Sequence, residues 1–264
     1  MALYDYPFPS YSWPYQGVDF AVIGNMSQDM ADQMYLDGIR FIGRYLFAQQ
    51  FPYGKGISAT EASYYLNAGI SIFFYYEVSS NDALGGYSRG YQNGQNCLLQ
   101  CQALGVPAGT QIYCCCDTGV TDSQAAGVVM DYLRGFKDAL PGYSIGIYGG
   151  QNVMEACYSA DPNYYRVQAG AWGAKEFSPI NVRQWPLAYN GNANRDGYIN
   201  IANITISGGY AYWRGYNVDL CSAPDLTNMW NSGSPGPTPP IPPVPPGPGP
   251  EDKKMPIWMY LKPF

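Results

Sequence analysis

Short apolar segments alternate with amphipathic ones along most of this chain, and the alternation limits it to few folds. The apolar segments predict strands at about 16–22, 39–46, 70–77, 110–117, 144–149, 167–172, 180–185 and 215–220. The segments between them predict helices over 28–37, 58–68, 87–104 and 122–139, the second starting with a capping box of Ser58 and Glu61. This order predicts an α/β fold, a (β/α)8 TIM-like barrel. A doubly wound open sheet is the alternative, although no glycine-rich phosphate loop follows the first strand.

Three segments of different composition divide the chain. Residues 1–232 form the predicted barrel domain. Residues 233–250 read GSPGPTPPIPPVPPGPGP, which predicts a stiff polyproline II linker. Residues 251–264 are too short to fold alone, yet they carry Ile257, Trp258, Met259, Tyr260, Leu261 and Phe264. We expect 255–264 to be a docking peptide for a groove on another protein, and a frayed chain end is the alternative.

Histidine is absent from the 264 residues, and its absence excludes several catalytic classes. Ser-His-Asp and Cys-His catalysis, histidine-ligated zinc and imidazole proton shuttles all need that side chain. Acid–base chemistry would therefore have to come from carboxylates, tyrosines, lysines or cysteines.

Charge and aromatic content indicate which partners the surface suits. The net charge is −6 with only 14 Lys and Arg, so we expect no nucleic-acid partner. The chain holds 26 Tyr, 6 Trp and 10 Phe, and such rings stack on sugars or line protein interfaces. Glycans and protein surfaces are the expected partners, unless most of the tyrosines simply cover the barrel.

Seven cysteines occur without a CxxC pair: Cys97, Cys101, Cys114, Cys115, Cys116, Cys157 and Cys221. An odd number without histidine argues against a zinc site and favours reduced, buried thiols. A disulfide between distant members stays open at this point.

Polar and aromatic side chains end the predicted strands, where the active sites of such barrels lie. In strand order they are Asp19, Arg44 and Tyr45, Tyr76 and Glu77, Asp117, Tyr148, Trp172, Gln184 and Trp185, and Asp219. Four are carboxylates, although the chain has only 20 acidic residues. Their convergence predicts a functional site at one rim, whereas a single strand-end carboxylate is often only a helix cap or half of an ion pair.

Carboxyl groups beside aromatic rings suit glycosidic bond cleavage. One carboxyl stays protonated, and another is ionised as base, nucleophile or stabiliser. We therefore predict catalysis by Glu77, Asp117 and Asp19. The predicted substrate-binding residues are Arg44, Tyr45, Tyr76, Tyr148, Trp172, Gln184, Trp185 and Asp219. A divalent cation on Asp19, Asp117 and Asp219 is the competing interpretation, but no EF-hand spacing supports it, so no metal and no other cofactor is expected.

Six motifs occur in a fixed order over about residues 14–222: QGVDF, GIRFIGRYL, KGISATE, AGISIFFYYE, ALGVPAGTQIYCCCD and SIGIYGG. In this run the chain resembles the glycoside-hydrolase-like domain family of unknown function numbered 1906. That family is similar to the lysozyme-type family 25 glycoside hydrolases, which are TIM-like barrels acting on peptidoglycan. The resemblance implies a barrel that acts on cell-wall glycan.

By this resemblance, Asp19, Glu77 and Asp117 match the acidic residues of the first, third and fourth strands. The lysozyme-type relatives carry an Asp-x-Glu pair on the fourth strand, whereas here Cys115 precedes Asp117 by two positions and Gly119 follows it by two. The usual acid is missing from its usual place. Glu77 is therefore expected to act as the general acid, in a muramidase-like way, with Asp117 or Asp19 as its partner.

The two ends of the chain predict a setting. The start has no basic and apolar leader, and no apolar run reaches the length of a membrane span, so we expect a chain made in the cytoplasm without a signal peptide. With its linker and terminal peptide, the barrel resembles a minor tail protein of bacteriophages that infect actinobacteria. We expect several copies in the virion, docked to other tail proteins through residues 255–264.

Two functions from different classes stay open. The rim carboxylates favour a hydrolase of peptidoglycan or arabinogalactan. The missing Asp-x-Glu pair and the abundant tyrosines favour a non-catalytic glycan-binding or structural module built on a degenerate glycosidase barrel. A metal-dependent hydrolase of another ester or phosphate is a third interpretation.

Overall fold

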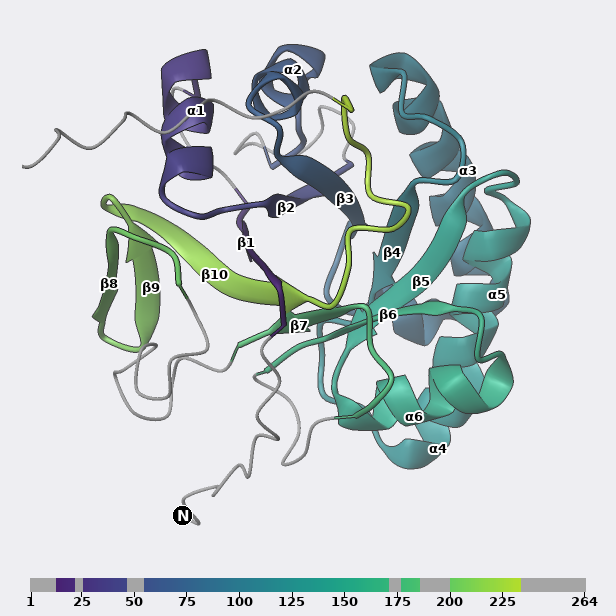
Figure 1. The fold of residues 1–264 in the computed structure, drawn as a ribbon. Helices are drawn as coiled ribbons and strands as arrows, with labels where there is room; N and C mark the ends of the chain where they lie inside the picture. Colours follow the sequence, from purple (N-terminus) through teal and green to yellow (C-terminus); the bar gives the residue numbers. More distant parts are fainter. Residues whose placement is uncertain (1–12, 22–25, 47–54, 171–176, 186–199, 234–264) are drawn as a thin grey trace, which may run out of the picture.

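The computed structural model describes residues 13–21, 26–46, 55–170, 177–185 and 200–233. Strands and helices alternate through most of these ranges (Figure 1). The alternating part consists of β1 (Tyr15–Asp19), α1 (Gln28–Leu36), β2 (Phe41–Tyr45), α2 (Ala59–Asn67), β3 (Ser71–Tyr76), the 3-10 helix η1 (Asp82–Gly85), α3 (Gly86–Leu104), β4 (Gln111–Cys115), α4 (Asp122–Gln124), the π-helical turn η2 (Ala125–Val129), α5 (Met130–Asp138), β5 (Ser144–Gly149), α6 (Gln151–Ala160), β6 (Tyr165–Gln168) and β7 (Val182–Gln184). Three strands follow: β8 (Ile204–Ser207), β9 (Tyr210–Trp213) and β10 (Tyr216–Ala223). The predicted linker after Gly233 and the predicted docking peptide lie outside the described residues.

Eight of the described strands close into a barrel. Strands β1 to β7 lie side by side in chain order and run parallel. Strand β10 completes the ring because it pairs with both β7 and β1. Helices surround the barrel (Figure 1), so the predicted α/β fold with a TIM-like barrel is confirmed.

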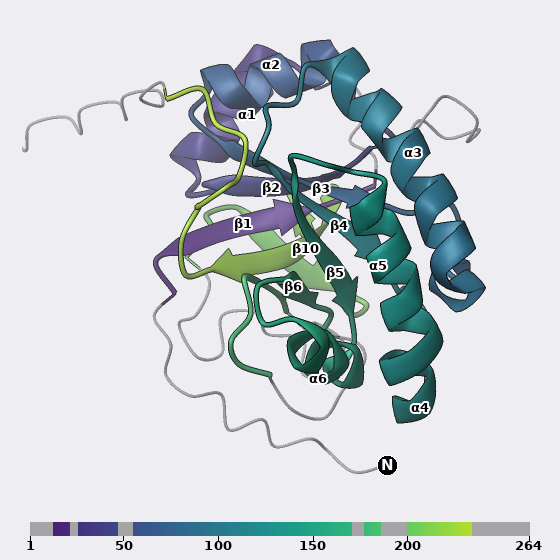
Figure 2. The same ribbon diagram turned by 90° about the vertical axis from the view of Figure 1, so that its right-hand side faces the viewer.

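The eighth barrel strand runs against the others, unlike in a (β/α)8 barrel. Figure 2 shows the arrowheads of β1 and β10 pointing to opposite sides. Gly208 and Gly209 join β8 to β9, and Arg214 and Gly215 join β9 to β10, all with φ between 48° and 89°. Such two-residue turns join antiparallel strands, whereas a parallel strand needs a longer crossover. Strand β10 therefore enters the barrel from a hairpin rather than from a helix.

The barrel wall separates two hydrophobic clusters. Side chains such as Ile42, Phe74 and Ile147 belong to the cluster between the wall and the helices. Inside the barrel, an aromatic cluster includes Phe73 and Tyr113, whose rings meet edge-on with centroids 5.5 Å apart. Successive residues of a strand point to opposite faces, so one strand feeds both clusters.

Gly43 on β2 makes room for this interior. A Cβ atom at that position would lie 2.6 Å from the ring of Phe73 and 2.8 Å from the Cβ of Asp19. Both distances are shorter than van der Waals contact. The absence of a side chain at Gly43 therefore lets Asp19 and Phe73 occupy the same level of the barrel.

The predicted helices are present, with small shifts at their ends. Helix α2 begins as expected after Ser58, whose Oγ accepts a hydrogen bond from the Glu61 N–H at 3.0 Å. The predicted capping box is only half formed, because the Glu61 carboxylate accepts hydrogen bonds from Arg44 and Tyr65 instead. The predicted helix 122–139 is divided into α4, η2 and α5, while α6 and the β8–β9 hairpin were not predicted.

None of the described helices is both long enough and apolar enough to cross a membrane.

Candidate active site

The carboxyl ends of the parallel strands bring most of the predicted site residues together. The residues on the inner side of the barrel at this end are Asp19, Tyr45, Glu77, Asp117, Tyr148, Gln184 and Asp219. Asp219 arrives by another route than expected. It pairs with Asp19 across the antiparallel β1–β10 ladder, so it lies at this end although β10 runs the other way. The resulting cluster of four carboxyl groups is called the rim cluster below.

Three predicted residues point away from the rim cluster, because each neighbours an inward-facing residue in its strand. Arg44 lies outside the barrel, where its Nε is 2.7 Å from Oε1 of Glu61 on α2. Tyr76 packs against Phe136 of α5, with ring centroids 5.8 Å apart. Trp185 belongs to the outer cluster and donates from Nε1 to Ser222 Oγ at 3.1 Å. Trp172 lies outside the described residues.

Asp19 and Asp219 form the lower pair of the rim cluster. Asp19 is only 2% exposed, whereas Asp219 lies exposed at the end of the barrel. Asp19 accepts hydrogen bonds from Gln184 Nε2 at 3.1 Å, Tyr75 Oη at 3.3 Å and Cys221 Sγ at 3.1 Å. These uncharged donors do not offset the other effects: burial and the nearby charge of Asp219 raise the pKa of Asp19 to about 8. At neutral pH, Asp19 is therefore mainly a neutral acid.

Glu77 and Asp117 form the upper pair. Their carboxyl groups share a hydrogen bond, and Lys55 Nζ forms an ion pair with Glu77 Oε2. Burial, the charge of Glu77 and that hydrogen bond raise the pKa of Asp117 to about 6. Asp117 is half-buried and Glu77 is 7% exposed. At or below about pH 6, the upper pair therefore holds a transferable proton beside an ion-paired carboxylate.

Tyrosines form the wall around both pairs. The Tyr75 ring lies 5.4 Å from that of Tyr45 and 5.3 Å from that of Tyr148, measured between centroids. Tyr148 donates to Gln184 Oε1 at 2.9 Å, which links the tyrosine wall to Asp19 through the Gln184 amide. Burial raises the pKa of all three phenols well above their ordinary value, so they act as neutral hydrogen-bond donors and ring surfaces.

Two contributors were missed by the sequence analysis. Tyr75 could have been found by alternation, because Glu77 faces inward and the residue two positions earlier must do the same. Lys55 begins the KGISATE motif quoted above, but this segment has no strand pattern that would place its side chain at the rim. The interior thiols Cys115 and Cys221 are buried with strongly raised pKa values, which does not suit a nucleophile. All seven cysteines are free and buried, as expected.

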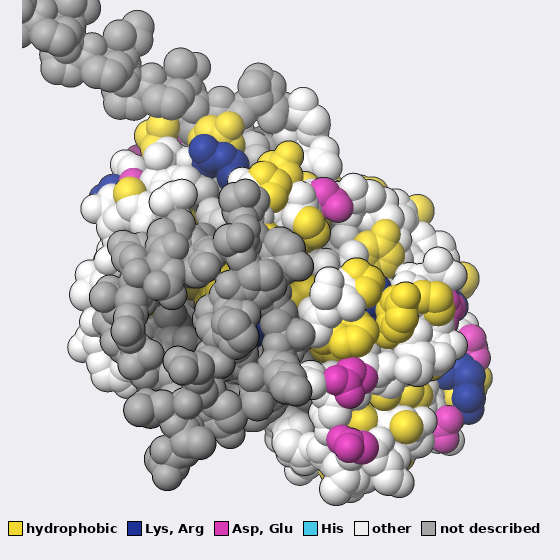
Figure 3. All heavy atoms as spheres, turned by 60° about the horizontal axis from the view of Figure 1, so that its bottom comes forward, with side chains coloured by type: hydrophobic (Ala, Val, Ile, Leu, Met, Phe, Trp, Pro, Cys, Tyr) yellow, Lys and Arg dark blue, Asp and Glu magenta, His cyan; other side chains and the backbone are white. Residues whose placement is uncertain are grey.

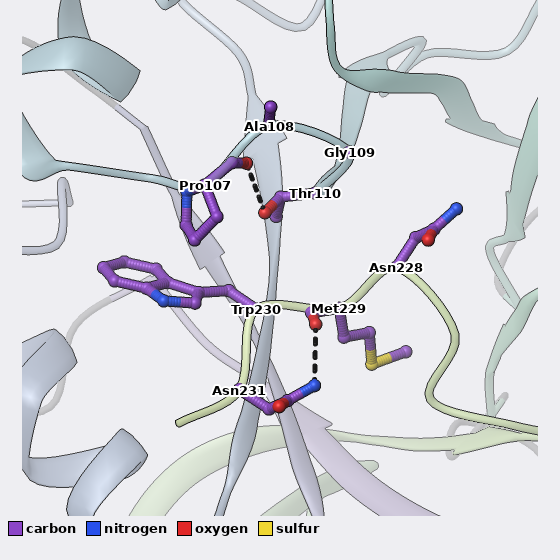
Figure 4. Close-up of a pocket in the computed structure, with 8 residues that line it drawn as sticks. All are labelled: Pro107, Ala108, Gly109, Thr110, Asn228, Met229, Trp230 and Asn231. Carbon is purple, nitrogen blue, oxygen red and sulfur yellow. Dashed lines mark hydrogen bonds between the residues drawn. The ribbon is translucent and has the colours of Figure 1, made fainter. Parts of the chain in front are cut away.

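A separate pocket lies near the opposite end of the barrel. It has a volume of about 290 Å³ and is lined by Pro107, Ala108, Gly109, Thr110, Asn228, Met229, Trp230 and Asn231 (Figure 4). Residues 107–110 lead into the start of β4, whereas Asp117 follows the end of that strand. This pocket is therefore not part of the rim cluster.

Figure 3 shows one face of the molecule, on which hydrophobic and acidic side chains lie beside one another and the coloured basic side chains are scattered. Within the described ranges, no group of three or more His, Cys, Asp or Glu side chains has a geometry that could hold a metal ion.

Comparison with known proteins identifies the family. Among solved structures, the Tat-secreted protein Rv2525c of Mycobacterium tuberculosis, in complex with L-tartrate, has a TM-score of 0.60 and 19% identity, over 82% of this chain and 98% of that one. An uncharacterized B. stearothermophilus protein has a TM-score of 0.53 and 18% identity, over 82% of this chain and 100% of that one. At these identities the likeness concerns the fold alone. Among curated proteins, none matches the chain.

The family model described as the Rv2525c-like, glycoside hydrolase-like domain matches residues 32–213. This match spans more than half of the chain and includes strands β2 to β7 of the barrel. The chain therefore belongs to the family of Rv2525c-like, glycoside hydrolase-like domains.

Proposed function

We propose that this domain binds a bacterial cell-wall glycan, peptidoglycan or arabinogalactan, and hydrolyses a glycosidic bond in it. The observation that carries the proposal is the pairing of four carboxyl groups at one end of the barrel, with a proton-bearing and an ion-paired member in the upper pair. Glycosidic cleavage needs an acid and a carboxylate in one site. Membership of a glycoside hydrolase-like family supports the same reaction class.

In this proposal the proton donor and the second catalytic carboxylate come from different pairs of the rim cluster. Two carboxyl groups that share a hydrogen bond leave no room for a sugar ring, since glycosidases separate their two carboxyls by at least about 5 Å. Glu77 and Asp117 therefore act together on one side of the scissile bond. Asp219, the exposed member of the lower pair, is the carboxylate available on the other side.

Asp117 is the proton donor in this proposal, in place of Glu77, which the sequence analysis favoured. A general acid works best when its pKa lies near the working pH, and the pKa of Asp117 is raised to about 6. Glu77 is held by Lys55 and accepts the hydrogen bond, so it orients Asp117. Asp19 is paired with Asp219 in the β1–β10 ladder, and its raised pKa favours the neutral acid beside that carboxylate.

Sugar rings would bind against the half-buried Tyr45 and Tyr148, whose phenols stay neutral. Arg44, Tyr76 and Trp185 are not assigned to the substrate, because their side chains lie outside the barrel.

The direct test measures reducing ends released from purified mycobacterial peptidoglycan and from arabinogalactan, with co-sedimentation measured on the same samples. Release by the wild type is expected to exceed that of Asp117→Asn, while Asp131→Asn should behave like the wild type. Asp131 is a matched control because it is a carboxylate on α5 with an exposed side chain, paired with Arg134 at 2.9 Å.

A second function, binding without hydrolysis, is favoured by one observation. Asp117 lacks the second acid of the Asp-x-Glu pair that the lysozyme-type relatives carry, because Cys115, a buried thiol, stands two positions before it and Gly119 two positions after it. Sedimentation with wall material without any release of reducing ends would support this glycan-binding or structural module instead.

We further propose that the chain is a minor tail protein of a bacteriophage, present in several copies. The support comes from the sequence: a proline-rich stretch over 233–250 and an aromatic peptide over 255–264. Deletion of residues 251–264 should prevent incorporation of the protein into tails without changing its thermal unfolding. Normal incorporation of the deleted protein would contradict the docking role.

A further inference from the structure

One cation distinguishes the two members of the upper pair. Lys55 Nζ pairs with Glu77 Oε2 and lies 3.9 Å from the centre of the Tyr45 ring. The Lys55 side chain is 25% exposed, so its charge is partly shielded from solvent by the protein. The ammonium group therefore acts at short range on Glu77, and Glu77 in turn shares a hydrogen bond with Asp117.

The backbone around Lys55 is fixed by β2. Gly56 forms an isolated parallel bridge with Tyr45, and the Ile57 N–H donates to the Tyr45 carbonyl at 3.0 Å. Arg44 Nη1 donates to the Lys55 carbonyl at 3.3 Å. Arg44 is itself 2% exposed and held by Glu61 on α2. Arg44, which strand alternation directs out of the barrel, thus helps to anchor the segment that carries Lys55.

We propose that Lys55 is a positioning residue of the upper pair: its ammonium group keeps Glu77 as the hydrogen-bond acceptor, so that the transferable proton resides on Asp117. No bond is broken in this arrangement, and Lys55 does not exchange a proton with the substrate. The inference rests on the proposed function for its catalytic meaning. The location of the proton is a property of the free protein and is testable without substrate.

The groups that face Asp117 come from its own strand and from five other elements. They are Glu77 after β3, Lys55 before α2, Asp219 on β10, Cys115 on its own strand, Tyr148 on β5 and Tyr45 on β2. Lys55 is the positively charged member of this set, and its charge lowers the pKa of Asp117, while Glu77 and Asp219 raise it. Removal of the Lys55 charge must therefore raise the pKa of Asp117.

The test is a carboxyl-detected NMR titration of the full chain with labelled Asp and Glu, with the Asp117 signal assigned from Asp117→Asn. Wild type should show a midpoint near the pKa of about 6 for Asp117. In Lys55→Met the midpoint should rise by about 1–2 units, the size of effect that a charge within a few ångströms exerts. The shared proton should then be divided between Asp117 and Glu77, so the Asp117 signal should complete a smaller part of its shift in that step than in wild type. Lys55→Arg keeps the charge and should stay close to wild type. An unchanged midpoint in folded Lys55→Met would overturn the proposal.

Two further measurements keep the outcomes separate. Lys55→Gln replaces the charge by a polar side chain, so it should raise the midpoint like Lys55→Met and covers the case in which the methionine variant does not fold. If reducing ends are released, the alkaline limb of kcat/KM should move upward in Lys55→Met and not in Lys55→Arg. A shifted midpoint without any release of reducing ends would support the role of Lys55 and contradict the proposed hydrolysis. Release of reducing ends with an unshifted midpoint would support the hydrolysis and contradict the role of Lys55.

Discussion

Asp19 and Asp37 are both buried carboxyl groups, 2% and 6% exposed, yet their environments act in opposite directions. Asp19 meets the uncharged donors of Tyr75, Gln184 and Cys221 and lies beside another acid, and its pKa is raised to about 8. Burial also acts to raise the pKa of Asp37. Hydrogen bonds from Arg214, Asn203, Trp213 and Gln33 outweigh it and hold that pKa below its ordinary value.

The comparison shows that burial alone does not decide the protonation of a carboxyl group; the number of its hydrogen-bond donors and the charges beside it also count. Asp37 receives Arg214 Nε at 2.7 Å, Trp213 Nε1 at 3.0 Å and Asn203 Nδ2 at 3.0 Å, and these contacts tie the end of α1 to the β8–β9 hairpin. Asp37 thus stabilises the fold. The rim cluster holds four carboxyls with Lys55 as the cation that pairs with Glu77, and its proposed role is proton transfer.

The largest expected effect concerns the rim cluster. Asp117→Asn removes the proposed acid while keeping its shape, so release of reducing ends should fall roughly 10²–10⁴-fold. The free energy of unfolding should stay within about 1 kcal/mol of wild type, because the half-buried carboxyl is exchanged for a neutral amide. Turnover within twofold of wild type would remove Asp117 from the donor role.

The next largest effect is expected on stability, at Asp37, which is the buried carboxyl outside the rim cluster. Asp37→Ala leaves the buried indole N–H of Trp213 and the Arg214 guanidinium without their acceptor, which should lower the free energy of unfolding by about 2–4 kcal/mol. Urea denaturation at pH 7 measures this difference. A loss below about 1 kcal/mol would show that the hairpin does not depend on Asp37.

Asp19→Asn should raise the free energy of unfolding, whereas Asp37→Ala should lower it. In the folded chain the pKa of Asp19 is about 8, whereas an unfolded aspartate ionises near 3.8, so wild type loses stability as pH rises from about 4 to about 8. The variant lacks this loss and should be more stable than wild type at pH 8, by at most the roughly 5 kcal/mol that a shift of about 4 units represents. The gain should shrink towards pH 4. Equal gains at both pH values, measured in urea, would contradict the raised pKa of Asp19.

The smallest effect tests the charge in the Asp37 network. Arg214→Gln removes the cation but leaves Trp213, Asn203 and Gln33 as donors, and the Arg214 side chain is 41% exposed. A loss of about 1 kcal/mol at pH 7 is expected. Below pH 4 the two proteins should converge, since the stability that depends on ionised Asp37 is lost there in both. A difference that persists at pH 2 would point to packing rather than charge.

Alternation explains which predicted site residues were placed correctly. The sequence analysis selected neighbouring pairs at three strand ends: Arg44 with Tyr45, Tyr76 with Glu77, and Gln184 with Trp185. A strand directs successive side chains to opposite faces, so one member of each pair had to point outward. The pattern was present in the sequence, but it needed one inward-facing residue as a reference before it could be applied.

The sequence by itself determined the order of strands and helices, the α/β fold and the carboxylates that end the strands, because hydrophobic spacing and turn residues act locally. The Gly208–Gly209 pair is likewise a local signal for the turn of the β8–β9 hairpin. The tertiary structure alone decided that β10 enters antiparallel and pairs Asp219 with Asp19, that Lys55 reaches Glu77, and that burial and Glu77 raise the pKa of Asp117. These outcomes depend on contacts between residues far apart in the chain, where burial and neighbouring charge set the chemistry, and no local pattern encodes them.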